Sequence, residues 1–489
     1  MSIPIAVKFW LLVLIPASMA LVIQQDQSTL LTACQAIAKA ISPASQVFYP
    51  PSTPYESDIL HWAVSSSASS ACSVEPGTAA DVGVILRTVA SSRTPFAVKG
   101  GGHTTNPGFS STSGVEISMT RFSHVFVNAA ARTVNVGAGL TWDQVYTALN
   151  HTGVNVVGGR VPAVGVAGVT LGGGYSWKSN QYGLTVDNIE AYELVLPNGT
   201  VMTVTDAQED LWFGLRGGFN NFGIVTTFTF KSHPQTAVWA GVLEVSVEHL
   251  DEFNTALAGY AAQADEKAAM IAGYESTANS TAIAALMFYD APTPPSGLFD
   301  GLMAMPTLGG AVQTTTFSEY VSSLSSAVGS GGSRALYSCA PVLRYTPTLL
   351  TAIANETAAL AQQLGALDPT VTVTTVAEPF QAGLFSHGAP SAYPPDRARA
   401  LLPTNPYITW TNASLDSVMH DALWGLTERI QAAAIAEGQD VAGAAMYPNY
   451  APYDTPLEML YGANVPRLRA LREKYDPTDV MGLTGGFKL

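Results

Sequence analysis

The chain has 489 residues, of which 47% are hydrophobic and only 12% are charged. Disordered chains are poor in apolar residues and rich in charge, so this composition excludes disorder as the main state. At about 150 residues per domain the length predicts two or three domains. The 22 Lys and Arg residues against 37 Asp and Glu residues give a net charge of -15, so we expect no nucleic-acid partner.

The N-terminus has the three parts of a secretory signal peptide. Lys8 precedes the apolar run 9–15, and the small residues Ser18 and Ala20 mark a cleavage site. The alternative, a membrane anchor, needs about 20 apolar residues, and the polar residues 24–27 end the run too early for that. We therefore predict a signal peptide over residues 1–20, a secreted mature protein and no membrane partner.

The cysteines agree with an oxidising compartment. Cys34 and Cys72 both lie early in the mature chain, where they can pair as a disulfide. Cys339 then remains as a buried free thiol, and with no Cys-x-x-Cys pair or His-x-x-x-His spacing we expect no metal site. The sequons that predict a glycoprotein start at Asn150, Asn198, Asn279, Asn355 and Asn412.

Two kinds of territory follow along the chain. Residues 74–235 are rich in Val and Gly and mix short strands with helices, whereas residues 236–440 alternate strands with Ala- and Leu-rich helices. In the first territory we predict helices over 81–94 and 141–150, strands over 95–98 and 223–230, a strand–turn–strand unit over 125–137, and a hairpin of 188–196 with 201–205. In the second we predict strands over 238–247, 282–289 and 371–376, helices over 349–364 and 416–436, and loops over 292–297 and 329–333.

Three glycine-rich segments carry the chemical signal. Because glycine has no Cβ, the backbone N–H groups of residues 99–104 can converge on a pyrophosphate. The small residues of 158–174 allow a planar ligand to approach the backbone, and residues 216–225 form another exposed turn that enters a strand. The alternatives are a flexible turn with a solvated histidine and close packing of the core. No G-x-G-x-x-G opens a helix after a first strand, which disfavours a Rossmann site.

These motifs, in this order, carry a resemblance. The runs P-x-x-V-K-G-G-G-H, V-G-V-A-G-x-x-L-G-G-G, G-L-T-V-D-N and L-W-F-G-L-R-G-G-F-N-N-F-G-I-V resemble the FAD-linked oxidases of the vanillyl-alcohol oxidase/PCMH superfamily. The C-terminal runs 447–450, 461–464 and 474–477 are similar to the berberine-bridge-enzyme-like branch, whose fungal members are oxygen-dependent FAD-linked oxidoreductases. The match extends over nearly the whole mature chain.

The resemblance implies an α+β fold of two domains. We expect a PCMH-type FAD-binding domain over 21–235 and a separate α/β substrate domain over 236–440, in which helices cover an antiparallel sheet. The C-terminal segment 441–489 is expected to return to the FAD domain. The implied partners are a small-molecule substrate and O2, and we expect a monomer.

The resemblance also implies how FAD is held. In the family the histidine of the G-G-H loop, here His103, is bonded to the 8α-methyl carbon of the flavin. Many members add a bond from a cysteine where this chain has Val161, so we expect monocovalent FAD. The expected cofactor-binding residues are Lys99, Gly100, Gly101, Gly102, His103, Thr104, Gly159, Val164, Gly165, Gly168, Gly172, Gly173, Ile224, Val225, Asn449 and Tyr450.

Tyr447 is the candidate catalytic residue, since it matches a family tyrosine that faces the flavin. A free tyrosine has a pKa near about 10, so a base at this position needs a nearby positive charge or hydrogen bond. The alternative is a tyrosine that only packs against the ring. Asp187 and Asn188 either position backbone near the cofactor or form a plain turn, and the histidines other than His103 have no assigned role.

The implied function is a secreted FAD-dependent oxidase. It would oxidise a small organic substrate, a secondary-metabolite alcohol or related group, and pass the electrons to O2 to give H2O2. The alternatives are a mono- or oligosaccharide oxidase and a non-catalytic flavin-fold binding protein. In the family branch, Val at the position of Val164 admits oxygen and Leu blocks it, which favours an oxidase here; the alternative is a plain core residue.

Overall fold

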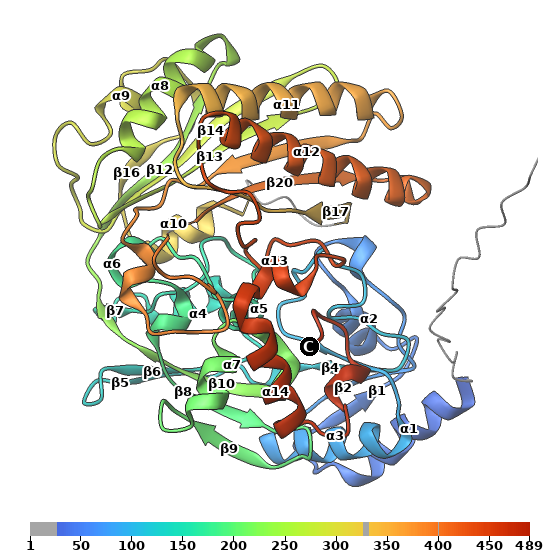
Figure 1. The fold of residues 1–489 in the computed structure, drawn as a ribbon. Helices are drawn as coiled ribbons and strands as arrows, with labels where there is room; N and C mark the ends of the chain where they lie inside the picture. The colour runs from blue at the N-terminus through green and yellow to red at the C-terminus, as the bar shows by residue number, and fades with distance from the viewer. Residues whose placement is uncertain (1–26, 326–331, 400) are drawn as a thin grey trace, which may run out of the picture.

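The computed structural model describes residues 27–325, 332–399 and 401–489. The chain folds into two halves, and both ends of the described chain lie in the lower half of the view in Figure 1. The predicted signal peptide lies outside the described residues, as does part of the predicted loop 329–333. In the described part of the chain, no helix combines the length and the apolar character needed to cross a bilayer.

The first sheet lies in the lower half and is tied to the N-terminal helix. Helix α1 (Gln27–Ala40) is joined to β2 by the Cys34–Cys72 disulfide, which confirms the predicted pair, and Cys339 is a buried free thiol, as predicted. In the described residues this sheet has four strands in the order β1-β2-β4-β3, with β2 and β3 both parallel to β4. The strands are β1 (Gln46–Phe48), β2 (Cys72–Glu75), β3 (Phe96–Lys99) and β4 (Val115–Ser118).

Helix α3 (Ala79–Ser92) confirms the helix predicted over 81–94. It begins after Thr78, whose side chain accepts a hydrogen bond from the Asp81 backbone N–H at 3.1 Å, and it ends at Arg93 in the left-handed conformation. The chain then enters β3 directly. The first glycine segment therefore emerges from the carboxyl end of a parallel strand, the usual place for a ligand in such sheets.

An antiparallel sheet completes the lower half. Its order in the described residues is β5-β6-β10-β8-β9, and the predicted strand–turn–strand unit, hairpin and strand 223–230 are all confirmed. Its strands are β5 (Val125–Asn128), β6 (Thr133–Gly137), β8 (Ile189–Val195), β9 (Val201–Val204) and β10 (Ile224–Lys231). A separate small pair joins β7 (Val154–Asn155) to β11 (His233–Pro234). The helices of this half are α2 (Thr53–Ile59), α4 (Trp142–Leu149), α5 (Val166–Leu171), α6 (Ser179–Tyr182) and α7 (Glu209–Leu215).

The upper half is built on an antiparallel sheet of nine described strands. Its main path is β15-β12-β14-β13-β19-β20-β17, with β16 on β12 and β18 on β20. The strands are β12 (Val238–Val245), β13 (Ala268–Ser276), β14 (Thr281–Tyr289), β15 (Thr307–Gly309), β16 (Val312–Thr315), β17 (Arg334–Tyr337), β18 (Ala340–Val342), β19 (Thr372–Ala377) and β20 (Leu402–Trp410). The strands predicted over 238–247, 282–289 and 371–376 are confirmed.

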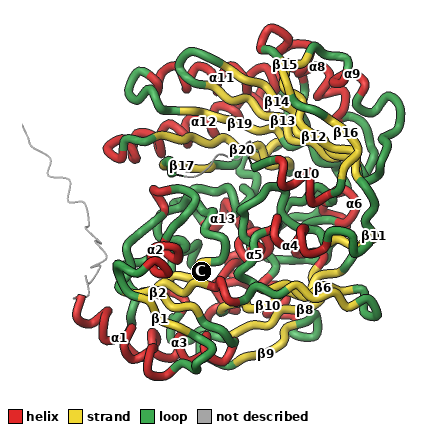
Figure 2. Tube along the Cα trace, turned by 180° about the vertical axis from the view of Figure 1, so that it is seen from behind, coloured by secondary structure: helices red, strands yellow, loops and turns green. Residues whose placement is uncertain are grey.

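Helices cover one face of this nine-stranded sheet, as a comparison of Figures 1 and 2 shows. Helices α11 (Pro347–Gly365) and α12 (Asp416–Ala436) confirm the two predicted helices and bury the apolar stripes that include Leu350 and Leu426. The other helices of this half are α8 (Leu250–Ala261), α9 (Asp300–Met303) and α10 (Phe317–Ser323). The predicted α+β fold, with a helix-covered antiparallel sheet over residues of the second territory, is thus confirmed.

The last residues of the chain pack against the lower half. Helix α13 (Leu457–Tyr461) is followed by α14 (Val465–Tyr475), which lies beside α7. Thr484 then forms a parallel bridge to Phe96 of β3. The segment that carries Tyr447 is therefore held between the nine-stranded sheet and the glycine segments. The domain boundaries at 235 and 440 stay predictions.

Candidate cofactor and active site

The first two glycine segments touch through their backbones. A Cβ built on Gly101 would lie 2.5 Å from the Gly165 nitrogen, and one on Gly165 would lie 2.4 Å from the Gly101 nitrogen. Real Cβ atoms do not approach backbone atoms so closely, so both positions require glycine. Gly100 lies beside them with more room, because its Cβ would first meet the Ala138 carbonyl at 3.3 Å.

The turn after β3 uses the Lys99 side chain for its own support. The Lys99 ammonium donates to the backbone carbonyls of Asp58 and Ser57 at 2.6 and 3.2 Å. Gly102 has φ +65, and a Cβ there would lie 2.7 Å from the Lys99 Cε. The Lys99 side chain therefore supports the turn from within, through two of its three N–H donors. Thr104 is half-buried, and its hydroxyl accepts a hydrogen bond from the Asn106 N–H at 3.3 Å.

His103 presents an unpartnered nitrogen inside the molecule. Its ring stacks on Trp62 with centroids 4.6 Å apart, and its buried Nε2 atom has no hydrogen-bond partner among the described residues. Burial lowers the pKa of His103 to about 4, so the imidazole is neutral at pH 7. A neutral imidazole keeps the nitrogen lone pair that a covalent bond to carbon requires.

A group of ionisable side chains lies buried behind this turn. Lys99 and His61 flank Glu116, with His61 Nε2 4.0 Å from a Glu116 carboxylate oxygen, and Asp58 accepts a hydrogen bond from Ser73 at 2.6 Å. The Glu116 side chain is fully buried, and neither of its oxygens has a hydrogen-bond partner among the described residues. Burial raises the pKa of Glu116 to about 8, against the opposing charge of Lys99. Glu116 is therefore mainly protonated at pH 7.

The second glycine segment runs from a tryptophan to the C-terminal motif. A Cβ on Gly159 would lie 2.4 Å from Trp142, and one on Gly172 would lie 2.4 Å from the Asn449 amide oxygen. Gly173 has φ +114 and faces Tyr393. Gly168, on α5, has no neighbour within 4 Å of its Cβ position among the described residues. This segment therefore links the first glycine segment to the motif around Tyr447.

Val164 is half-buried within the same segment. Its carbonyl accepts a hydrogen bond from the Trp142 N–H at 3.0 Å, and its side chain packs against the core. Both predictions for Val164, an oxygen-gating residue and a packed core residue, fit this position.

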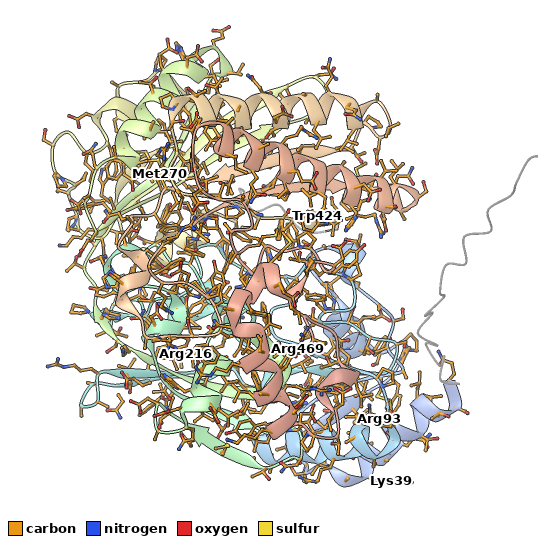
Figure 3. All side chains as sticks on the ribbon, in the orientation of Figure 1. Lys39, Arg93, Arg216, Met270, Trp424 and Arg469 are labelled. Atoms are coloured by element: carbon orange, nitrogen blue, oxygen red, sulfur yellow. A yellow bond between two sulfur atoms is a disulfide. The ribbon has the colours of Figure 1, made fainter. Side chains whose placement is uncertain are left out.

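The third glycine segment is organised by a buried charge cluster. Asp187 accepts from Arg216 at 2.6 Å and from Arg397 at 2.8 Å, and its other oxygen accepts from the Leu184 N–H. Arg216 lies in the lower half (Figure 3). Asp187 thus ties three segments together through its side chain, which is more than the plain turn considered from sequence. Asn188 donates to the Tyr182 and Leu184 carbonyls.

Ile224 and Val225 are core residues of β10. They are 2% and 3% exposed and pair with Val195 and Leu194 of β8. Their side chains belong to the hydrophobic core of the lower half. Any contact with a cofactor would therefore be made from the start of this strand, next to Gly223.

Tyr447 is buried and receives hydrogen bonds that favour its phenolate. The Asn449 amide donates to the Tyr447 hydroxyl at 2.7 Å and also to the Val169 carbonyl at 3.1 Å. The Tyr175 backbone N–H donates to the same hydroxyl. Burial raises the pKa of Tyr447 to about 12, while the Asn449 and Tyr175 hydrogen bonds and the nearby Arg160 charge lower it. The hydrogen bonds that its oxygen accepts from Asn449 and Tyr175 would stabilise the phenolate if the proton were removed.

Sequence reasoning missed a buried ion pair next to Tyr447. Arg160 contacts Glu378 at 2.7 Å and donates to the Tyr450 hydroxyl at 2.8 Å, while Tyr450 donates to the other Glu378 oxygen at 2.8 Å. The Tyr447 and Tyr450 rings meet edge to face with centroids 4.9 Å apart. A signal existed for Arg160 alone, an isolated charge inside a run of Gly and Val. Glu378 follows β19 with no motif around it.

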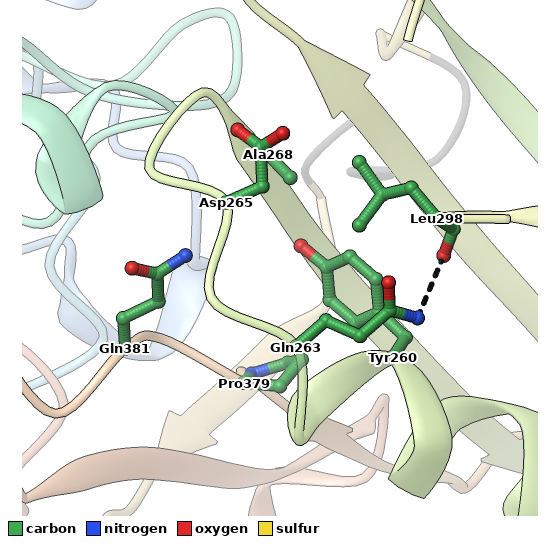
Figure 4. Close-up of a pocket in the computed structure, with 7 residues that line it drawn as sticks. All are labelled: Tyr260, Gln263, Asp265, Ala268, Leu298, Pro379 and Gln381. Atoms are coloured by element: carbon green, nitrogen blue, oxygen red, sulfur yellow. Dashed lines mark hydrogen bonds between the residues drawn. The ribbon is translucent and has the colours of Figure 1, made fainter. Parts of the chain in front are cut away.

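A small cavity lies elsewhere, under α8 (Figure 4). It is too narrow to admit a water molecule, and Gln263 spans one side by donating to the Leu298 carbonyl at 3.4 Å. Its lining residues are Tyr260, Gln263, Asp265, Ala268, Leu298, Pro379 and Gln381. None of these is a predicted site residue, so this cavity is not the candidate active site.

The residues present fit FAD. The touching glycines at 101 and 165 form a turn that side chains would block, and His103 offers a buried, unpartnered nitrogen at the end of it. Tyr447, Asn449 and Tyr450 reach the same region from the C-terminal segment through Gly172 and Val169. Closely packed glycine backbone, a buried imidazole with an unpartnered nitrogen and a buried tyrosine are therefore brought together from three parts of the chain.

Comparison with known families supports this assignment. Residues 70–205 match the family described as FAD binding domain, and residues 446–484 match the family described as berberine and berberine like. A structure of a chitooligosaccharide oxidase has the same fold, with a TM-score of 0.74 at 19% identity, covering 94% of this chain and 99% of that one.

Two fungal relatives show the same relationship in sequence. The chain is 33% identical over 285 residues to an uncharacterized FAD-linked oxidoreductase of Arthroderma benhamiae, a match that spans 57% of either protein. It is 28% identical over 457 residues to the FAD-dependent monooxygenase drtC of Aspergillus calidoustus, covering 88% of this chain and 84% of the relative. The chain thus combines an FAD-binding domain with a berberine-like C-terminal segment, and its relatives are named FAD-linked oxidoreductases and FAD-dependent monooxygenases.

Proposed function

We propose that this protein is a secreted, FAD-dependent oxidase in which Tyr447 removes a proton from a small organic substrate, such as a secondary-metabolite alcohol. The observation that carries the proposal is the environment of Tyr447. Its oxygen accepts hydrogen bonds from Asn449 and from the Tyr175 backbone, and Arg160 lies close by. All three interactions favour the phenolate, the form that a general base needs, and they oppose the larger effect of burial, which raises the pKa of Tyr447 to about 12.

The chain's own residues would hold FAD at this place. The backbone of residues 99–104 would bind the pyrophosphate, and the neutral His103 imidazole would carry the single covalent bond to the flavin. Bound FAD supplies a two-electron acceptor that O2 can reoxidise to H2O2. In balance, a substrate CH–OH group and O2 become a C=O group and H2O2.

The role of Tyr447 is to take the hydroxyl proton of the substrate. Tyr447 is buried, with an exposed fraction of 3%, so little water is present to compete for this proton. Asn449 fixes the direction of the Tyr447 hydroxyl and at the same time anchors it to the Val169 carbonyl of the second glycine segment. The proton acceptor is thus held on the segment that would contact the flavin.

The substrate class is proposed from the residues around Tyr447 and from named relatives. Tyr175 and Tyr393 surround the Tyr447 ring at centroid distances of 4.8 and 5.5 Å, which suits a flat, apolar substrate. The drtC relative is named a monooxygenase, and the chitooligosaccharide oxidase with the same fold is named for a sugar. A mono- or oligosaccharide substrate is the second candidate, on that likeness of fold.

The test is replacement of Tyr447 by Phe. We expect Tyr447→Phe to slow substrate-driven flavin reduction by about 10²- to 10⁴-fold, the usual contribution of general base catalysis. Tyr461→Phe is the matched control, because Tyr461 is also a fully buried tyrosine and its hydroxyl has no partner among the described residues. Release of H2O2 over a panel of phenolic alcohols, polyketide alcohols and sugars would identify the substrate. Equal reduction rates in wild type and Tyr447→Phe would contradict the proposal.

A further inference from the structure

Three distant segments meet at one buried ion pair. Arg160 comes from the second glycine segment, Glu378 from the end of β19, and Tyr450 from the C-terminal segment. Arg160 contacts Glu378 at 2.7 Å, and the Tyr450 hydroxyl bridges the two by accepting from Arg160 and donating to Glu378, both at 2.8 Å. Arg160 also lies over the Phe380 ring, 5.4 Å from its centroid.

Both charged side chains are removed from water. The Arg160 side chain is 7% exposed and the Glu378 side chain 1%. Desolvating two charges opposes folding, and well-packed apolar side chains of the same size often hold segments together equally well. Holding the two halves together therefore does not by itself explain why charged residues occupy these two positions.

The ion pair faces Tyr447. The ring of Tyr450, which contacts both charges, meets the Tyr447 ring with centroids 4.9 Å apart. The positive charge of Arg160 favours the Tyr447 phenolate and the negative charge of Glu378 opposes it. The two charges thus act on Tyr447 with opposite sign.

The other ionisable groups packed around Tyr447 are uncharged at neutral pH. Burial raises the pKa of Tyr175, Tyr393 and Tyr450, and it raises the pKa of the Cys339 thiol, which accepts from the Tyr447 N–H, to about 12. Arg397, beyond Tyr393, is itself paired with Asp187. Arg160 and Glu378 are therefore the charges that decide how readily Tyr447 ionises.

We propose that Arg160 and Glu378 are positioning residues that set the charge state of Tyr447, with Arg160 favouring the phenolate and Glu378 restraining it. The inference rests on the proposed function for the meaning of that charge, but not for the coupling itself. Tyr450 holds the two charges in place, because its hydroxyl is hydrogen-bonded to both the Arg160 guanidinium and the Glu378 carboxylate.

If the two charges act on Tyr447, then removing each of them should move the pH at which Tyr447 ionises in an opposite direction. Glu378→Gln keeps the shape of the carboxylate and leaves the Arg160 charge, so Tyr447 should ionise at lower pH. The double variant Arg160→Gln with Glu378→Gln removes both charges without leaving a buried carboxylate unpaired. Because the Arg160 charge favours the phenolate, Tyr447 should then ionise at higher pH than in the Glu378→Gln variant. Arg160→Lys keeps the positive charge and should shift the titration least.

The coupling is measured directly, without turnover. Fluorotyrosine is placed at position 447 of the full-length holoenzyme, and its ionisation is followed by fluorine NMR as pH is raised. Asp290→Asn is the matched control, since Asp290 forms a buried ion pair with Lys178 at 2.8 Å that Tyr447 does not contact. Flavin absorbance and thermal melting show that each variant is folded.

A downward shift in Glu378→Gln that is reversed when Arg160→Gln is added, with no shift in Asp290→Asn, would support the proposal. No shift in Glu378→Gln, or no reversal on adding Arg160→Gln, would overturn it, because a merely structural ion pair does not produce a change of sign. The pH profile of flavin reduction then separates the two claims. At a pH below the ionisation of Tyr447, each unit of downward shift should raise the reduction rate about tenfold. If the NMR titration moves and the rate profile does not, the coupling stands and the proposed base is wrong.

Discussion

The two halves of the molecule use glycine in different ways. In the cofactor half a Cβ on Gly101 would lie 2.5 Å from the backbone of Gly165, whereas in the nine-stranded sheet a Cβ on Gly273 would first meet Val376 at an ordinary 3.7 Å. A site built from backbone atoms forces glycine at fixed positions and so leaves a pattern in the sequence. A site built from side chains, such as that of Glu378 just after β19, leaves no such pattern.

The largest effect is expected from breaking the backbone contact in the cofactor half. Gly101→Ala pushes a methyl group into the nitrogen and Cα of Gly165, at 2.5 and 2.6 Å, and neither can move alone. We expect a loss of roughly 3 kcal/mol in unfolding free energy, the upper range for overpacking, together with loss of bound flavin. Urea unfolding and flavin absorbance of the purified protein measure the two effects.

Gly273→Ala is the matched change in the other half. There the added methyl group meets only Val376 and the Ala284 carbonyl, at 3.7 and 4.0 Å. We expect a change within about 0.5 kcal/mol and a normal flavin content. If the two glycine variants were equally stable, the contrast between the halves would be wrong.

The second prediction concerns His103, the residue that the resemblance assigns to the covalent bond. We expect His103→Ala to fold and to release its flavin completely on acid precipitation, because the described chain offers no cysteine near Val161 for a second bond. The yellow colour of the precipitated wild-type protein is the measurement. His124→Ala, on an exposed histidine, is the control and should keep its flavin. Flavin retained in the His103→Ala precipitate would contradict the monocovalent assignment.

Much of the fold could be predicted because its signals are local. Helix α12 ends where the Ala-rich periodicity predicts, and the hairpin of β8 and β9 follows from the turn residues 197–199. Strand β20 could not be predicted in the same way. It contains Pro403 and Pro406, which normally mark an edge strand, yet it lies between β19 and β17 in the sheet. Tertiary packing overrode the local signal there.

The candidate site also contains residues that the sequence predicts and residues that it does not. The glycine segments, His103 and Tyr447 were readable in sequence, and the structure brings them together. Lys99 was assigned to the cofactor as a backbone donor, which stays a prediction, and the structure adds that its side chain donates to the carbonyls of Ser57 and Asp58. The pair of Arg160 and Glu378 is separated by more than two hundred residues, so only the fold could reveal it.

The third prediction tests the buried charges behind the first glycine segment. The raised pKa of Glu116, about 8 against an ordinary 4.5, means that the folded state binds more protons than the unfolded state between these values. Stability must therefore fall as pH rises through this window. Glu116→Gln mimics the protonated acid and should remove that fall, giving an advantage on the order of a few kcal/mol at pH 9 and little at pH 5.

Urea unfolding of both proteins at the two pH values measures this difference. Glu248→Gln, a change of the same kind on an exposed residue of the upper half, is the control. Parallel stability curves for wild type and Glu116→Gln would show that Glu116 is ionised in the fold. In that case the positive charge of Lys99 would offset the effect of burial on the pKa of Glu116.

The smallest effect is expected at Val164, where the two alternatives from sequence are still open. Val164 is half-buried and lies one residue before Gly165, the glycine that touches Gly101. If an oxygen path beside the flavin passes this side chain, one added methylene narrows it. Val164→Leu should then slow flavin reoxidation by about tenfold, equivalent to about 1.4 kcal/mol in the barrier. Reduction by substrate should be nearly unchanged, because it depends on Tyr447.

A core residue would behave differently in the same experiment. Overpacking by one methylene costs about 1 kcal/mol or more in unfolding free energy, and it gives no reason for reoxidation alone to slow. Stopped-flow measurement of both half-reactions, with urea unfolding of the same variant, therefore distinguishes the two roles. Equal reoxidation rates in wild type and Val164→Leu, with a lowered stability, would make Val164 a core residue.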